Sequence, residues 1–91
     1  MSIQVKIAPI LQEYFDVPGI LGVKGNTIGE CLKDLIKQDP EARSWLFDQN
    51  GLLQILVSIK NKETVVLNRN GLDRTMNSND ELQISAVIGG G

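Results

Sequence analysis

The stretch Asp80-Glu-Leu-Gln-Ile-Ser-Ala-Val-Ile-Gly-Gly-Gly91 is the part of the chain that decides the fold. It begins as a β-strand, because apolar Leu82 and Ile84 alternate with polar residues. It ends in three glycines, which have no side chain to bury and lose the most backbone entropy on ordering. We therefore expect a folded domain over residues 1–88, followed by a flexible tail over residues 89–91 that can enter a narrow channel of another protein. An inert, disordered end is the alternative.

The composition is that of a small domain with weak overall charge. The 91 residues are 42% hydrophobic and 22% charged, with a formal net charge of -2. No block of lysine or arginine is present, so we do not expect a nucleic-acid partner. No apolar run approaches the roughly 20 residues that span a bilayer, and the first residues lack the apolar core of a signal peptide. We expect one cytoplasmic domain without membrane association.

The residue types that are missing limit the chemistry of the chain. It contains no histidine and a single cysteine, Cys31. This excludes an internal disulfide and any nucleophile that depends on a histidine base. The commonest metal ligand is also missing, so we expect no metal site, no bound cofactor and no enzymatic activity of the chain itself. Cys31 lies at an apolar position of a predicted helix, which favours core packing over a role in carrying sulfur.

The remaining pattern predicts strands joined by two helices. Thr27 and Glu30 match a capping box at the start of the main helix, and Pro40 should stop this helix near residue 38. A second short helix is expected over residues 40–47, with proline in its first turn. Residues 10–15 are expected to form a turn or a helical connector. Strands are predicted over residues 2–8, 20–24, 52–60 and 64–67 and after residue 80.

This order predicts an α+β fold with one mixed sheet of four to five strands. The main helix should pack across one face of the sheet, and the first and last strands should pair in parallel at its centre. Leu11, Tyr14 and Phe15 are expected to cover one end of the core. The cluster Trp45-Leu46-Phe47 is expected to close the core beneath the second helix, with a partner surface as the alternative.

The element order, together with the glycine ending, resembles the ubiquitin-like β-grasp sulfur carriers. This family includes the small subunit of molybdopterin synthase and the thiamine-pathway sulfur carrier. The resemblance covers essentially the whole chain and implies the β-grasp fold. Its most specific part is the ending, where the matching positions are Asp80, Leu82, Ile84, Val87, Ile88 and the Gly90-Gly91 pair.

The resemblance implies a sulfur carrier protein in which the Gly91 carboxylate is the reactive group. An adenylyltransferase-type activating enzyme would use ATP and magnesium to form an acyl-adenylate, and a sulfur donor would displace AMP to leave a thiocarboxylate. A sulfur-accepting enzyme of amino-acid, thiamine or molybdopterin biosynthesis would then take the sulfur. Glycine is required at position 90, next to Gly91, and Gly89 adds flexible length to the tail. The reason is that only a tail without side chains can follow the carboxylate into a site that excludes water.

Three apolar residues are candidates for docking the activating enzyme. Leu56 and Val87 fall by alternation on the sheet face away from the helix, and Ile88 follows Val87 directly. Exposed apolar residues on this face would form a partner surface, although isolated surface apolar residues are also common. Asp80 and Glu81 are adjacent and therefore point to opposite faces, so a turn explains them better than a catalytic pair.

The same tail would also serve two other kinds of protein. A ubiquitin-like protein modifier would transfer the activated Gly91 to a lysine of a target and form an isopeptide bond. A plain β-grasp interaction domain would carry inert glycines. The products separate the three functions: a thiocarboxylate, a ladder of conjugates, or no activation at all.

Overall fold

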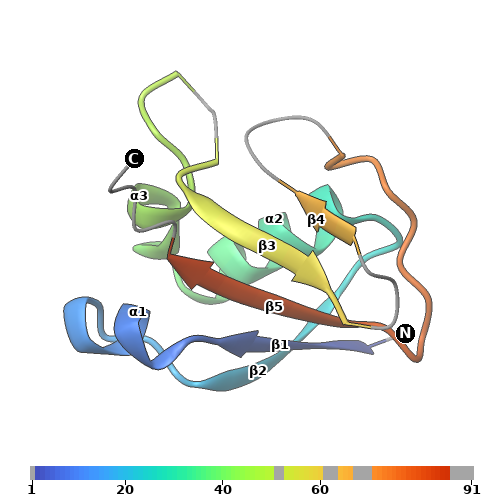
Figure 1. Cartoon of the computed structure of the whole chain (residues 1–91), viewed down its shortest axis with the longest axis horizontal. Helices are drawn as coiled ribbons and strands as arrows, with labels where there is room; N and C mark the ends of the chain where they lie inside the picture. Colours follow the sequence, from blue (N-terminus) through green and yellow to red (C-terminus); the bar gives the residue numbers. More distant parts are fainter. Residues whose placement is uncertain (1, 51–52, 61–63, 67–70, 87–91) are drawn as a thin grey trace.

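The computed structural model describes residues 2–50, 53–60, 64–66 and 71–86. The helices and strands of this part, in chain order, are β1 (Ser2–Ile7), α1 (Pro9–Tyr14), β2 (Ile20–Lys24), α2 (Ile28–Gln38), α3 (Ala42–Leu46), β3 (Ile55–Ile59), β4 (Thr64–Val66) and β5 (Glu81–Ala86). The strands form one mixed sheet, and α2 packs across one of its faces (Figure 1). The predicted layering of a mixed sheet with one main helix is confirmed.

β5 lies at the centre of the sheet, whose strand order is β2-β1-β5-β3-β4. It pairs in parallel with β1 and antiparallel with β3, so Ile84 lies opposite Ile7 on one side and opposite Val57 on the other. A parallel pair needs a crossover connection, and the chain between β1 and β5 supplies it. The predicted parallel pairing of the first and last strands is confirmed.

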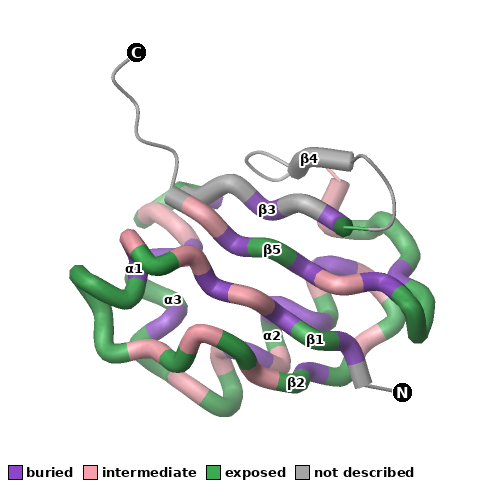
Figure 2. The backbone as a smooth tube through the Cα atoms, turned by 60° about the horizontal axis from the view of Figure 1, so that its bottom comes forward, coloured by how far each residue is buried: buried purple, intermediate pink, exposed green. Residues whose placement is uncertain are grey.

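The core lies between the sheet and α2. Alternate side chains of the strands are buried, and so is one face of α2. Figure 2 shows this alternation of buried and exposed positions along the central strands. The buried residues of these elements are Ile3, Val5, Ile7, Val23, Ile28, Cys31, Leu32, Leu35, Val57, Ile59, Leu82 and Ile84. A period of two in the strands and of 3.6 in the helix thus brings the apolar residues into one core.

The start of α2 is fixed by the capping box that the sequence predicts. The Thr27 Oγ1 accepts a hydrogen bond from the Glu30 amide at 3.2 Å, and the Glu30 Oε1 accepts one from the Asn26 amide at 2.8 Å. At the other end, the Asp39 amide donates to the Leu35 carbonyl at 2.8 Å. Backbone groups that the helix leaves unsatisfied at its ends are therefore bonded on both sides.

Thr27→Ala should lower the free energy of unfolding by about 1 kcal/mol, because the Glu30 amide loses its acceptor. Thr27→Ser keeps the hydroxyl and is the matched control, with an expected stability close to that of the wild type. Urea unfolding followed by circular dichroism measures both variants. Equal midpoints for the alanine and serine variants would show that the cap contributes nothing.

α1 departs in part from the predicted architecture, since the described residues form three helices where two were expected, although a helical connector was one of the expectations for residues 10–15. Pro9 opens this helix, because its fixed φ and missing N–H suit a first turn. Leu11 is buried as predicted, but Tyr14 is 76% exposed and does not cover the core. A helix of 6 residues turns only a narrow face inward, and Leu11 occupies it. Phe15 is 36% exposed but stacks on the buried Trp45, with ring centroids 5.7 Å apart, so it covers this part of the core as predicted.

The third strand is shorter than predicted, because β3 begins at Ile55 and not at residue 52. Leu53 forms an isolated bridge with Phe47 outside the sheet ladder. Next to it, the Gln54 amide donates to the Leu46 carbonyl at 2.9 Å, and the Gln54 Nε2 donates to the Phe47 carbonyl at 2.6 Å. These bonds hold residues 53 and 54 against α3 and delay the start of the strand.

The aromatic cluster after Pro40 is divided between the core and the surface. Trp45 and Leu46 are buried, as predicted. Phe47 is only half-buried and lines a cavity beside α3. Phe47 also packs against the core, so the prediction that the three residues close the core is confirmed for Trp45 and Leu46 and in part for Phe47, which lies just beyond the last residue of α3.

Candidate functional site

The predicted reactive tail follows the last residue of β5. Ala86 is the Cα partner of Ile55 on β3. On the opposite side, the Ile84 carbonyl accepts a hydrogen bond from the Ala8 amide at 2.8 Å. β5 is therefore held by neighbouring chain on both sides up to Ile84, and by β3 alone up to Ala86. Residues 87–91, which include all three predicted tail glycines and the docking candidates Val87 and Ile88, lie outside the described residues, and their roles stay predictions.

An exposed aromatic surface, which we name the α1 corner, lies at the end of α1 and consists of Tyr14 and Phe15. Ile20, at the start of β2, is also 55% exposed, but it pairs with Lys6 and lies on the sheet face away from the core. α1 packs against β5 and lies next to the tip of the β5 arrow in Figure 1. The Gln12 Nε2 donates a hydrogen bond to the Ile7 carbonyl at 3.1 Å and fixes α1 to the end of β1. The sequence pattern does not reveal this surface, because it predicts that Tyr14 and Phe15 cover one end of the core.

Leu56, the third docking candidate, reaches the same end of the sheet. In the ladder between β3 and β5 it is the Cα partner of Ser85, the neighbour of Ala86. Val57, the next residue of β3, is buried in the core. The structure thus brings the backbone of Leu56 next to the end of β5, while the direction of its side chain stays a prediction.

Charged groups gather at the opposite end of β5. Glu81 lies 3.6 Å from the Lys6 Nζ and 3.8 Å from the Lys60 Nζ through its two carboxylate oxygens. The Asp80 Oδ2 accepts a hydrogen bond from the Asn77 amide at 2.8 Å and so closes the turn before the strand. The two carboxylates therefore have separate structural contacts, as expected for adjacent residues, and do not converge on one site.

Comparison with known proteins identifies the fold. No protein-family profile and no curated protein matches the chain. SAMP1 from Haloferax volcanii, a crystal structure, superimposes with a TM-score of 0.77 over 100% of both chains at 25% identity. The solution structure of the small archaeal modifier protein 1 from Methanosarcina acetivorans has a TM-score of 0.74 and 21% identity, covering 99% of this chain and 96% of the other. A chain of the Amycolatopsis orientalis BexX/CysO complex has a TM-score of 0.67 and 22% identity, covering 98% and 99%.

The chain has the ubiquitin-like β-grasp fold. The resemblance seen in the sequence is thereby confirmed. Within the described part of this β-grasp domain, no group of three or more Cys, Asp or Glu side chains could hold a metal ion. None of the helices described is both long and apolar enough to cross a membrane.

Cys31 packs in the core of the β-grasp domain. Its side chain is 0% exposed, and burial raises the pKa of its thiol to about 11, with smaller contributions from Glu30 and Asp34. The group is therefore a neutral thiol at pH 7, and the thiol is a much weaker nucleophile than the thiolate. These properties agree with the predicted packing role.

The free energy of unfolding should fall between about pH 9 and pH 11 because of this thiol. The unfolded thiol ionises near its ordinary pKa of 9.0, whereas the folded thiol keeps its proton up to about 11. The native state then binds more protons than the unfolded state, so stability decreases as the pH rises through this window and is constant below it. Two pKa units correspond to about 2–3 kcal/mol. The free energy of unfolding, measured with denaturant at several pH values, should decrease less steeply with pH for Cys31→Ala than for the wild type. An equal dependence on pH in the two proteins would contradict this account.

Proposed function

We propose that this chain is a carrier protein whose Gly91 carboxylate is activated by an ATP-dependent enzyme and converted to a thiocarboxylate. The observation that carries the proposal is the position of β5. This central strand is paired with β1 up to Ile84 and with β3 up to Ala86, so the segment that leads to the glycines starts from a strand held in the middle of a ubiquitin-like domain. The similarity to solved carrier and modifier proteins supports the same use of the tail.

The chemistry begins with a carboxylate, which is a poor electrophile. Attack of a Gly91 oxygen on the α-phosphorus of ATP, assisted by magnesium in the partner enzyme, releases pyrophosphate and forms an acyl-adenylate. A sulfur nucleophile then attacks the carbonyl carbon and releases AMP, which leaves the thiocarboxylate. Residues 87–91 can extend roughly 16 Å at about 3.3 Å per residue, which is enough for the carboxylate to enter a deep site that keeps water from the adenylate.

A biosynthetic enzyme would accept the sulfur in the last step. The similarity to a chain of the BexX/CysO complex supports the binding of the activated carrier to such an enzyme. The tail would enter that enzyme as it enters the activating enzyme, since both must reach the same carboxyl group. On this proposal the chain is a co-substrate of two enzymes and not an enzyme itself.

A protein modifier is the second candidate function. It is favoured by the similarity to the modifier proteins of Haloferax volcanii and Methanosarcina acetivorans. Activation of Gly91 would be identical, but a lysine amine of a target protein would attack the carbonyl and form an isopeptide bond. A denaturing gel of cell extract containing the tagged chain, ATP and the activating enzyme tests this candidate. Higher-mass conjugates that disappear on deletion of Gly91 would favour the modifier over the carrier.

The activation step itself is tested by exchange of labelled pyrophosphate into ATP. We expect exchange in the presence of the adenylyltransferase from the same cell, magnesium and the intact chain. Deletion of Gly90 and Gly91 should abolish it. Exchange that is absent with a verified active partner would remove both candidate functions and leave a plain interaction domain.

The α1 corner is proposed as part of the docking surface for the activating enzyme, together with Leu56, Val87 and Ile88. Tyr14→Ser should lower the kcat/KM of activation by about tenfold, since a buried aromatic anchor is typically worth more than 1 kcal/mol at an interface. Glu13→Ser, at an exposed position of the same helix, is the matched control and should keep the wild-type value. Equal kinetics for the two variants would exclude α1 from the interface.

A further inference from the structure

A cavity lies between α2 and α3, on the helical side of the sheet. Its volume is about 620 Å³, within the roughly 300–1,000 Å³ that is typical of small-molecule sites. The residues that give it its chemical character are Lys33, Ile36, Arg43, Phe47, Asp48 and Leu72. None of the described residues that line it belongs to β5 or to the α1 corner.

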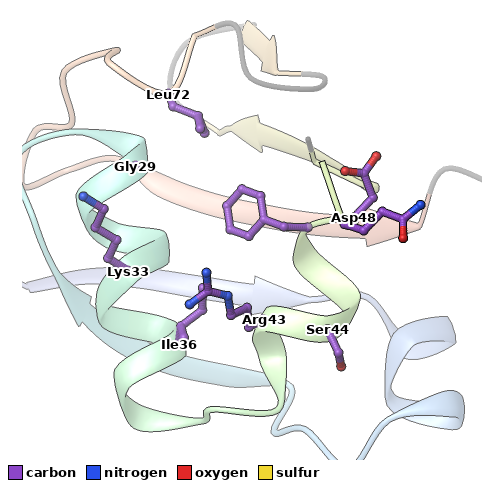
Figure 3. A pocket seen from close by; sticks show the side chains of 9 residues that line it. Gly29, Lys33, Ile36, Arg43, Ser44, Asp48 and Leu72 are labelled. Atoms are coloured by element: carbon purple, nitrogen blue, oxygen red, sulfur yellow. The ribbon is translucent and has the colours of Figure 1, made fainter. Parts of the chain in front are cut away.

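The cavity combines an apolar wall with two cations. Ile36 and Leu72 are half-buried and pack against the core, while Lys33 on α2 and Arg43 on α3 are exposed at its edge. Figure 3 shows these two side chains extending from the two helices that border the space. In the part of the chain that the structure describes, neither cation forms a salt bridge. Asp48 adds one carboxylate, so the lining has a net positive charge although the chain has a formal net charge of -2.

Hydrogen bonds set the walls of the cavity. The Gly29 amide donates to the Leu72 carbonyl at 2.7 Å, and a Cβ at Gly29 would lie 3.1 Å from that oxygen, so glycine allows the loop to approach α2 closely. The Gln54 Nε2 donates to the Ser44 carbonyl at 3.0 Å and to the Phe47 carbonyl at 2.6 Å, which fixes the end of α3. The walls are therefore shaped by the fold itself, as in the largely preformed sites that small molecules use.

We propose that this cavity binds a small organic anion that joins a phosphate or carboxylate group to an apolar or aromatic body. Lys33 and Arg43 hold the anionic group: the guanidinium donates paired hydrogen bonds to phosphate or carboxylate, and the ammonium adds a point charge. The body of the ligand covers the wall formed by Ile36, Phe47 and Leu72 and removes its apolar surface from water. This site is independent of the function proposed for Gly91.

Amide chemical shifts of the full chain, measured during titration with phenyl phosphate, benzoate and inorganic phosphate, test the proposal. We expect phenyl phosphate to shift the amides of Gly29, Lys33 and Arg43 and to bind at least about tenfold more tightly than inorganic phosphate, because only the former buries an apolar body. The ratio of the phenyl phosphate and benzoate affinities identifies the preferred anionic group.

Substitution of the two cations supplies the second arm of the test. The double variant Lys33→Gln and Arg43→Gln should bind phenyl phosphate about tenfold more weakly or worse, since hydrogen bonds to charged groups are lost. Lys37→Gln, on the same helix but outside the cavity, is the matched control and should bind like the wild type. An unchanged amide spectrum away from the cavity shows that the double variant is folded.

Three results would overturn the proposal. The first is the absence of localised shifts up to about 10 mM phenyl phosphate, a concentration that detects even millimolar affinity. The second is an equal affinity for inorganic phosphate and phenyl phosphate, or an affinity of the double variant for phenyl phosphate that equals that of the wild type. The third is saturation of the same amides by an acidic aromatic peptide with no response to phenyl phosphate, which would assign the cavity to a protein partner.

Discussion

Gly90→Val is expected to abolish the activation of Gly91, with a loss of at least about 100-fold in kcat/KM. The expectation follows from the chemistry of the tail. On the proposed function, the carboxylate must reach the α-phosphorus of ATP inside the partner enzyme, and a β-branched side chain one residue before it would widen the tail where it enters the site. A displacement of the reacting atom by about 1 Å is enough to reduce a rate by about 100-fold. The loss is measured by pyrophosphate exchange with the activating enzyme at subsaturating carrier concentration.

Two measurements serve as controls: the stability of this variant and the activation of a variant with a smaller change in the tail. The free energy of unfolding of Gly90→Val should equal that of the wild type, since residue 90 lies beyond the last residue of β5 and glycine has no side chain to bury. Gly89→Ala should reduce kcat/KM by less than about tenfold, because this residue lies farther from the reacting atom. Activation of Gly90→Val at the wild-type rate would show that the glycines are not required to enter a narrow site.

Leu82→Ala is expected to lower the free energy of unfolding by about 2–5 kcal/mol. Leu82 is 0% exposed and lies on β5, opposite Val5 on one side and Ile59 on the other. Truncation removes buried methyl groups and leaves a cavity at the centre of the sheet, where backbone pairing on both sides prevents collapse. Domains of this size have a total stability of about 5–15 kcal/mol, so the variant should lose a large part of it.

Gln83→Ala is the matched control for the stability measurement. Gln83 follows Leu82 on the same strand but is exposed, and among the described residues its side chain makes a single hydrogen bond, of 3.3 Å to Glu81. Its substitution should change the free energy of unfolding by no more than about 0.5 kcal/mol, as is usual for surface positions. Urea unfolding measures both variants. Similar midpoints for the two would contradict the assignment of Leu82 to the centre of the core.

The sequence contains enough information to predict the central sheet, because its signals are local and strong. The alternation of Ile3, Val5 and Ile7 specifies which face of β1 is buried, and the Thr27 capping box specifies where α2 begins. The parallel pairing of β1 with β5 then follows from the order of elements, since only a crossover connection joins parallel strands.

The parts that the sequence does not predict depend on contacts between distant residues. Tyr14 has the spacing of a core residue, but the six-residue α1 has room to bury only Leu11. Leu53 continues the alternation of β3, but Gln54 bonds to α3 and takes that segment out of the ladder. Both outcomes depend on tertiary packing, which overrides local pattern and propensity.

The proposed functional surfaces follow the same division. The Gly90-Gly91 ending is visible in the sequence because a lack of side chains is itself the signal. The exposure of residues 14–15 is not visible, because it depends on how the short α1 packs. The cavity is not visible either, because only the fold brings Lys33, Arg43 and Leu72 together.

The most direct test of the carrier proposal is the intact mass of the chain after incubation with ATP, magnesium, a sulfide source and the adenylyltransferase from the same cell. We expect a product that is heavier by the difference between one sulfur and one oxygen atom and that is absent when Gly91 is deleted. An unchanged mass, with a partner enzyme shown to be active on another substrate, would contradict the proposal that Gly91 is converted to a thiocarboxylate.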